Sequence, residues 1–155
     1  MVLLVVVGRA QTPLRNLDGG SFDPAANRGK IVVLAFGSTQ LPTAKLAVPG
    51  LQKLAERYAD RPVSFYWVSV DSERQGAKNF ASDAEIRVFA NQYGLHLPIL
   101  RDPERSAFRE FGIDALPTNV IIDRGGKAAF KQVGLNADRG EAYSDTIREL
   151  DKMLK

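Results

Sequence analysis

Hydrophobic positions along the chain alternate between strand-like and helix-like segments. Two β-rich runs, Ile31–Phe36 and Val63–Val70, are typical of strands buried on both faces of a sheet, a pattern that parallel sheets favour. Between these runs, apolar and small residues recur at spacings of three and four. This spacing predicts an amphipathic helix, with a kink at Pro49, that buries Leu46, Gly50, Leu51, Leu54 and Tyr58.

The second half of the chain continues the alternation. Asp83 is predicted to cap a helix that ends at Gly94 and buries Ile86, Phe89, Ala90 and Tyr93. A short strand is expected over Leu97–Leu100, and a turn of helix is expected to start at Asp102-Pro103 and to end at Gly112. Residues 119–123 and 128–133, joined through Gly125-Gly126, predict a β-hairpin. The last helix has its apolar positions at Tyr143, Ile147, Leu150 and Leu154.

The resulting order, β-α-β-α-β-α-β-β-α, predicts a three-layer α/β fold. Its mixed central sheet is expected to be mostly parallel with one antiparallel hairpin, and to carry helices on both faces. Residues 12–155 are expected to form a single domain, because no linker, repeat or low-complexity tract interrupts them. Residues 1–11 are interpreted as an apolar leader, either the remnant of an export signal or a strand. Its run Val2–Val7 is too short to span a membrane.

Composition narrows the chemistry that the chain can perform. The chain has 155 residues, 45% hydrophobic and 25% charged, which is typical of a globular domain. It contains no cysteine, which excludes disulfides and thiolate catalysis, and its only histidine is His96. The formal net charge is +3, and the basic residues are scattered along the chain rather than gathered in a stripe. We therefore expect no nucleic-acid partner, no metal and no cofactor.

A few residues allow two interpretations. Asp71 and Asp102 could form a carboxylate pair for acid–base chemistry or metal binding, but such residues more often begin turns and helices. We interpret Trp67 as a core residue and His96 as a half-exposed residue at the start of a strand. Gly125-Gly126 lies in a hairpin turn, so it does not form the strand-to-helix loop of a dinucleotide site.

Several short strings together resemble the thioredoxin-like superfamily. They resemble its redoxin branch, which includes AhpC/TSA proteins and TlpA/ResA-type thiol-disulfide oxidoreductases, many of them bacterial. The strings are Leu17-Asp18-Gly19-Gly20, Arg28-Gly29-Lys30 before the first long strand, Val68-Ser69-Val70-Asp71, and Leu116-Pro117-Thr118 before the hairpin. The resemblance implies a thioredoxin-like fold from about Thr12 onward, with a cis peptide bond at Pro117.

The chain departs from this family at the reactive centre. The family places a Cys-x-x-Cys motif where this chain has Leu41-Pro42-Thr43-Ala44, so Leu41 and Ala44 occupy the two cysteine positions. Phe36-Gly37-Ser38 also resembles deiodinase-like members, whose single reactive residue would again align with Leu41. Neither Leu41 nor Ala44 has a nucleophilic atom, and no catalytic residue is predicted at these positions.

Three hypotheses about function follow. The first is a redox-inactive module that binds a protein or an extended peptide in the groove between the Leu41 loop and the Pro117 loop. Its predicted contact residues are Gln40, Leu41, Pro42, Thr43, Leu116, Pro117 and Thr118. The second is an oxidoreductase or peroxidase-like antioxidant enzyme of the family whose cysteines have been replaced. The third is catalysis by the hydroxyl of Ser38, Thr39 or Thr43, for which the sequence offers no base.

The sequence identifies neither a compartment nor an oligomeric state. The resemblance implies an exported, periplasmic protein, with the cytoplasm as the alternative. The apolar residues at the start of the chain are the only other support for export.

Overall fold

The computed structural model describes residues 13–136 and 141–155 and builds them around one seven-stranded sheet. The strand order is β2-β1-β5-β4-β3-β6-β7. The strands are β1 (Leu14–Asn16), β2 (Ser21–Phe22), β3 (Ile31–Gly37), β4 (Val63–Ser69), β5 (Ile99–Arg101), β6 (Thr118–Ile122) and β7 (Ala128–Val133). The predicted leader, residues 1–11, lies outside the described residues.

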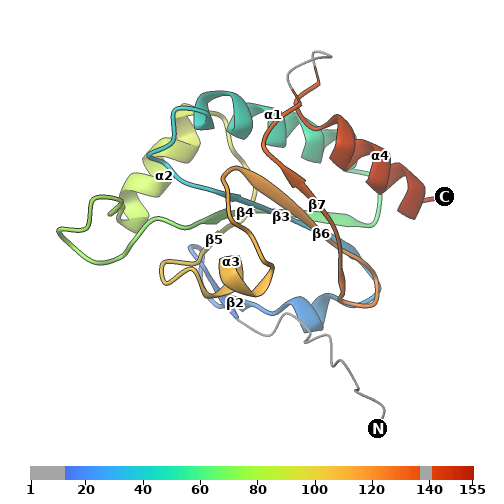
Figure 1. Ribbon diagram of the computed structural model, residues 1–155, viewed down its shortest axis with the longest axis horizontal. Coiled ribbons are helices and arrows are strands. Elements are labelled where there is room, and N and C mark those ends of the chain that lie inside the picture. The colour runs from blue at the N-terminus through green and yellow to red at the C-terminus, as the bar shows by residue number, and fades with distance from the viewer. Residues whose placement is uncertain (1–12, 137–140) are drawn as a thin grey trace, which may run out of the picture.

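The helices cover the two faces of the sheet unequally (Figure 1). The helices α1 (Ala44–Arg57), α2 (Asp83–Gln92) and α4 (Ser144–Met153) lie on one face, and the short α3 (Ser106–Glu110) lies on the other. A 3-10 helix, η1 (Pro24–Asn27), precedes β3. The predicted element order and the helices on both faces are therefore confirmed. Of the helices in the described ranges, none combines the length and the hydrophobicity that crossing a bilayer requires.

The prediction of a mostly parallel sheet was wrong. Only β3 with β4 and β4 with β5 pair in parallel. The other four pairings, β1 with β2, β1 with β5, β3 with β6, and β6 with β7, are antiparallel. All five residues of β6 are buried, as in a parallel strand, because β6 lies between two neighbours and under helices. A fully apolar run records burial on both faces but carries no information on strand direction.

The central strand β3 divides the core into two layers. Because side chains alternate along a strand, Ile31, Val33 and Ala35 face α1, α2 and α4, whereas Val32, Leu34 and Phe36 face α3. All six are buried. The ring of Phe36 packs edge-on against Phe108 and Phe111, with centroids 6.4 and 6.0 Å apart. The apolar strand therefore anchors both layers, and its carboxyl end leads directly into the Leu41 loop.

Two helix starts differ from the prediction. The N-cap of α2 is Ser82 rather than Asp83, and Ser82 forms a capping box with Glu85. Asp83 is the first helical residue, and its carboxylate is bound by Arg15 and Arg101 instead. The turn of helix expected at Asp102-Pro103 begins only at Ser106, although the Asp102 carboxylate accepts hydrogen bonds from the N–H groups of Ala107 and Phe108.

A buried amide fastens the last helix to the sheet. Gln132 of β7 accepts hydrogen bonds from the N–H and the hydroxyl of Thr146, at 3.0 and 2.7 Å. Its amide nitrogen donates to the carbonyls of Gly134 and Ala142 and to the side chain of Asn136. Such a fully paired buried amide fixes one position of α4 against β7.

Candidate functional site

The two positions that lack cysteine lie at the start of α1. Residues 38–43, the Leu41 loop, connect the carboxyl end of β3 to this helix. Leu41 is half-buried and Ala44, the first helical residue, is buried. Thr43 is the N-cap and makes no side-chain capping hydrogen bond. The first turn of α1 therefore keeps unpaired N–H groups, and no ionisable side chain occupies either aligned position.

The Leu41 loop and the Pro117 loop (residues 113–117) meet above the core. The Leu116–Pro117 peptide bond is cis, as the resemblance implied. Leu41, Ala44 and Pro117 line one small cavity together with Trp67 and Tyr143. Its volume is about 10 Å³, which leaves space for about one water molecule. The meeting point of the two loops is therefore a surface for docking rather than a pocket for a small molecule.

A buried carboxylate holds the Leu41 loop in place. Asp71, just beyond the end of β4, is completely buried. It accepts hydrogen bonds from the Ser38 hydroxyl at 2.5 Å, the Ser69 hydroxyl at 2.8 Å and the Thr39 N–H at 3.0 Å. The Ser38 oxygen in turn accepts a hydrogen bond from the Gln40 N–H. The carboxylate thus ties the end of β4 to the loop that follows β3.

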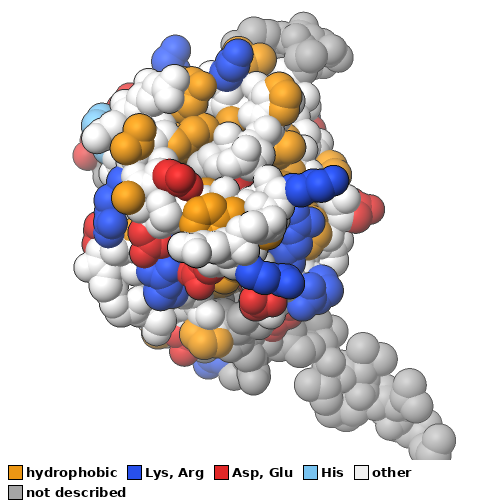
Figure 2. Space-filling model, turned by 90° about the vertical axis from the view of Figure 1, so that its left-hand side faces the viewer, with side chains coloured by type: hydrophobic (Ala, Val, Ile, Leu, Met, Phe, Trp, Pro, Cys, Tyr) orange, Lys and Arg blue, Asp and Glu red, His pale blue; other side chains and the backbone are white. Residues whose placement is uncertain are grey.

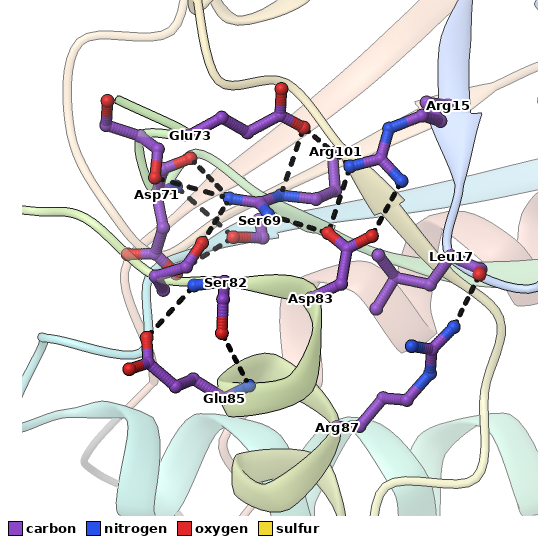
Figure 3. A network of polar contacts seen from close by, with 12 residues as sticks. Arg15, Leu17, Ser69, Asp71, Glu73, Ser82, Asp83, Glu85, Arg87 and Arg101 are labelled. Atoms are coloured by element: carbon purple, nitrogen blue, oxygen red, sulfur yellow. Dashed lines mark hydrogen bonds and ion pairs between the residues drawn. The ribbon is translucent and has the colours of Figure 1, made fainter. Parts of the chain in front are cut away.

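An arginine network supports Asp71 from below (Figure 3). The guanidinium of Arg101 is buried and donates to the backbone carbonyls of Asp71 and Ala81, which lie at the two ends of the loop before α2. It also binds Asp83 at 2.8 Å, and Arg15 reaches Asp83 and Glu73 from β1. The network therefore joins β1, β5, α2 and the loop that carries Asp71.

This network sets the charge state of Asp83. Arg15 donates to both carboxylate oxygens of Asp83, each at 2.9 Å, and Arg101 adds a third hydrogen bond. These hydrogen bonds hold the pKa of the Asp83 carboxyl well below its usual range. At the other side of the Leu41 loop, burial raises the pKa of the Tyr143 hydroxyl, which donates to the carbonyl of Ala47 and stays neutral.

A second hollow lies between the Leu41 loop and α2. It has a volume of about 390 Å³ and is lined by Gln40, Leu41 and Pro42 on one side and by Phe89 and Tyr93 on the other. Phe89 stacks on Trp67 with ring centroids 5.6 Å apart, and Tyr93 packs edge-on against Phe89 at 4.9 Å. Seen from the α2 side, hydrophobic side chains are scattered over the upper part of the surface, and basic and acidic ones interleave below them (Figure 2).

Phe89 and Tyr93 were missed as site residues by the sequence analysis. Their helical spacing placed them on the buried face of α2, and both are indeed partly buried against the core. No local signal shows that this face ends beside the Leu41 loop, since the two segments lie about fifty positions apart in the chain.

The remaining predicted contact residues differ in exposure. Gln40, Pro42 and Thr43 are exposed, and Leu116 and Pro117 are half-buried. Thr118 is buried, and its hydroxyl donates to the Ala115 carbonyl at 2.7 Å, so only its backbone lies near the groove. Leu116 is not among the residues that line either hollow.

The alternative chemistries find little support in the geometry. Asp71 and Asp102 each bind neighbouring donors, and the described residues contain no group of three potential ligands that could hold a metal ion. His96 is exposed rather than half-exposed, and it precedes β5 by two residues. Asp71 does supply the acceptor that the sequence did not offer to Ser38. Ser38, however, is only 6% exposed, so its hydroxyl is enclosed rather than presented to a substrate.

Comparison with known proteins now assigns the chain to a family. The model of the AhpC/TSA family matches residues 9–131. The chain belongs to the AhpC/TSA family. Thiol-disulfide oxidoreductase ResA of Bacillus thuringiensis (strain Al Hakam) is 26% identical over 119 residues, covering 77% of this chain and 64% of that protein. Thiol-disulfide oxidoreductase ResA of Halalkalibacterium halodurans is 29% identical over 116 residues, covering 74% and 60%. The chain thus spans less than two thirds of the length of these relatives.

Solved structures show the same fold. A thiol:disulfide interchange protein of the thioredoxin family from Chlorobium tepidum superimposes with a TM-score of 0.69 at 19% identity, covering 94% of this chain and 96% of that one. A secreted disulfide oxidoreductase of Mycobacterium tuberculosis superimposes with a TM-score of 0.65 at 22% identity, with the same coverage. This AhpC/TSA chain therefore has a thioredoxin-like fold, and it has it without any cysteine.

Proposed function

We propose that this chain is a redox-inactive, thioredoxin-like binding module. It takes an extended protein segment in the groove between the Leu41 loop and the Pro117 loop. The observation that carries the proposal is that Leu41, Ala44 and Pro117 line one cavity while neither cysteine position has a reactive atom. The fold brings the two loops together, and the residues there offer apolar contact in place of thiol chemistry.

The backbone at Leu116 supports an extended ligand. Within the described parts of the chain, the N–H and the carbonyl of Leu116 have no hydrogen-bond partner, whereas the Pro117 carbonyl is used by the Gly134 N–H. A strand laid beside Leu116 would satisfy both groups, which is how strand addition gains affinity. Exposed Pro42 and half-buried Leu41 would contact the side chains of that strand.

The second hollow adds room for one side chain of the ligand. Phe89 and Tyr93 offer aromatic faces and edges beside Gln40 and Pro42. Aromatic walls of this kind favour an apolar or aromatic side chain. The proposed ligand is therefore an extended segment with an apolar residue next to the stretch that pairs with Leu116.

The test is capture of a partner from lysate of the source organism by the parent protein and by two variants. The groove variant carries Leu41→Lys and Leu116→Lys. The control variant carries Val88→Lys and Ala129→Lys, two exposed positions on α2 and β7 that line neither hollow. It adds the same charge elsewhere, and circular dichroism checks that all three proteins are folded.

A partner that binds the parent and the control but not the groove variant supports the proposal. A partner kept by the groove variant moves binding to another face, and the absence of any partner contradicts a binding module. Reduction of a disulfide substrate by the parent protein would contradict the redox-inactive part.

A further inference from the structure

Three basic side chains form a row on α1 that the sequence did not reveal. Lys45, Lys53 and Arg57 are separated by eight and four residues, so all three lie on one side of the helix. All three are exposed, and none makes an ion pair within residues 13–136 and 141–155. The scattered charges of the sequence thus become an unpaired row in the fold.

This row forms one wall of a groove between α1 and α4. The groove has a volume of about 840 Å³. Its apolar lining comes from Leu46, Pro49, Leu54, Leu135, Ala142 and Ile147. Leu46 is 70% exposed, the highest value among the large hydrophobic side chains that the structure describes. Glu141 is the one acidic residue among the described lining residues.

We propose that the groove between α1 and α4 binds an extended acidic segment of a partner protein. The basic wall is complementary to carboxylates, and the apolar lining is complementary to hydrophobic side chains. A flat anionic surface such as a membrane would reach the basic row but leave the apolar floor unfilled. A protein segment with both kinds of side chain satisfies both walls.

The spacing of the row sets the pattern of the ligand. Four residues of helix rise about 6 Å, and two residues of an extended strand rise about 6.6 Å. Carboxylates at alternate positions of an extended segment therefore keep step with Arg57 and Lys53, and a third carboxylate four positions further on reaches Lys45. The residues between them point to the opposite side, toward the apolar floor. About seven residues fill the groove.

The test uses a defined peptide, acetyl-Glu-Leu-Glu-Leu-Ser-Leu-Glu-amide with a rhodamine label, and fluorescence anisotropy at low salt. We expect the triple variant Lys45→Gln, Lys53→Gln, Arg57→Gln to weaken binding about tenfold, since each exposed charge pair contributes modestly. The matched control, Lys30→Gln, Lys78→Gln, Lys127→Gln, removes the same charge from exposed positions outside the groove and is expected to bind within about twofold of the parent.

A second peptide of the same composition, acetyl-Glu-Glu-Glu-Leu-Leu-Leu-Ser-amide, tests the alternate spacing and is expected to bind more weakly. No binding of the first peptide, or equal losses in both triple variants, would overturn the proposal, and equal binding of the two peptides would overturn its extended register. Binding to phosphatidylglycerol vesicles without binding to the peptide would assign the row to a membrane surface instead.

Two further measurements distinguish a site for an acidic segment from a dimer interface and from an extension of the groove at Leu41. A dimer of the parent in sedimentation that dissociates in the Lys45, Lys53, Arg57 triple variant would assign the groove to a second copy of the chain and overturn the proposal. The variant Leu41→Lys, Leu116→Lys is expected to keep the peptide. Loss of peptide binding in that variant would mean that the two grooves are one site, which contradicts an independent surface.

Discussion

The carboxylate of Asp71 accepts a hydrogen bond from the hydroxyl of Ser38, 2.5 Å away, across the carboxyl ends of the two parallel strands β3 and β4. Because Asp71 also binds the Ser69 hydroxyl and the Thr39 N–H, one buried charge fixes the whole start of the Leu41 loop. In this chain without cysteine, the loop conformation depends on that carboxylate rather than on a thiol pair.

Replacing Asp71 with alanine should destabilise the protein by about 3 kcal/mol, because it leaves several buried donors without an acceptor. Ser38→Ala removes one of these hydrogen bonds and should cost about 1 kcal/mol. Urea unfolding followed by circular dichroism measures both free energies. The exposed Asp114→Ala serves as the control and should stay within about 0.5 kcal/mol of the parent. Equal effects of the two aspartate variants would contradict the role of Asp71.

Gly37→Ala should destabilise the end of β3 by about 1–3 kcal/mol, because a Cβ at this position would lie 2.8 Å from Nε1 of Trp67. The test is a double-mutant cycle with Trp67→Phe, which removes that indole nitrogen. The cost of Gly37→Ala should be smaller in the phenylalanine background than in the parent. An unchanged cost would show that the indole does not limit the space at Gly37.

Acid should weaken the network around Asp83. The pKa of its carboxyl is lowered in the folded state, by the hydrogen bonds of Arg15 first and of Arg101 second. Unfolded aspartate titrates near about pH 3.9, so the charged Asp83 contributes its full stabilisation above that pH. The contribution is lost as the pH falls below about 4 toward the lower folded-state value.

The corresponding measurement is the free energy of unfolding between pH 7 and pH 2. Asp83→Asn should lower stability at pH 7 and flatten the fall below pH 4, whereas the exposed Asp60→Asn should keep the slope of the parent. A slope below pH 4 that is the same in Asp83→Asn and in the parent would rule out Asp83 as the titrating group.

Restoring cysteine at the two aligned positions should create a reactive thiol. In the variant Leu41→Cys, Ala44→Cys, the uncapped first turn of α1 presents N–H groups and the positive end of the helix dipole, which lower the pKa of a nearby thiol. Alkylation rates as a function of pH should show a midpoint below about 8.5. Val88→Cys, exposed on α2, provides the reference thiol with an ordinary midpoint. Equal midpoints would contradict the placement of Leu41 at the helix terminus.

Much of the fold could be predicted because its signals are local. The burial of Ile31–Phe36 on both faces, the helix spacing that follows it and the Gly125-Gly126 turn each depend on neighbours within one element. Strand direction was predicted wrongly because it depends on which strand lies alongside. The short β1 beside β5 and the buried β6 beside β3 both run antiparallel, and nothing in their own residues specifies this.

The site divides in the same way. The absence of a nucleophile at Leu41 and Ala44 is a property of the residues themselves, so the sequence by itself determined that these positions cannot exchange disulfides. The sequence also determined the order of the elements. Tertiary structure alone decided that Asp71 reaches Ser38, that Phe89 and Tyr93 lie beside Gln40, and that α4 lines a groove with the basic row of α1. These contacts join residues about 30 to 100 positions apart in the sequence, and only the packing of helices on the sheet brings such residues within a few ångströms.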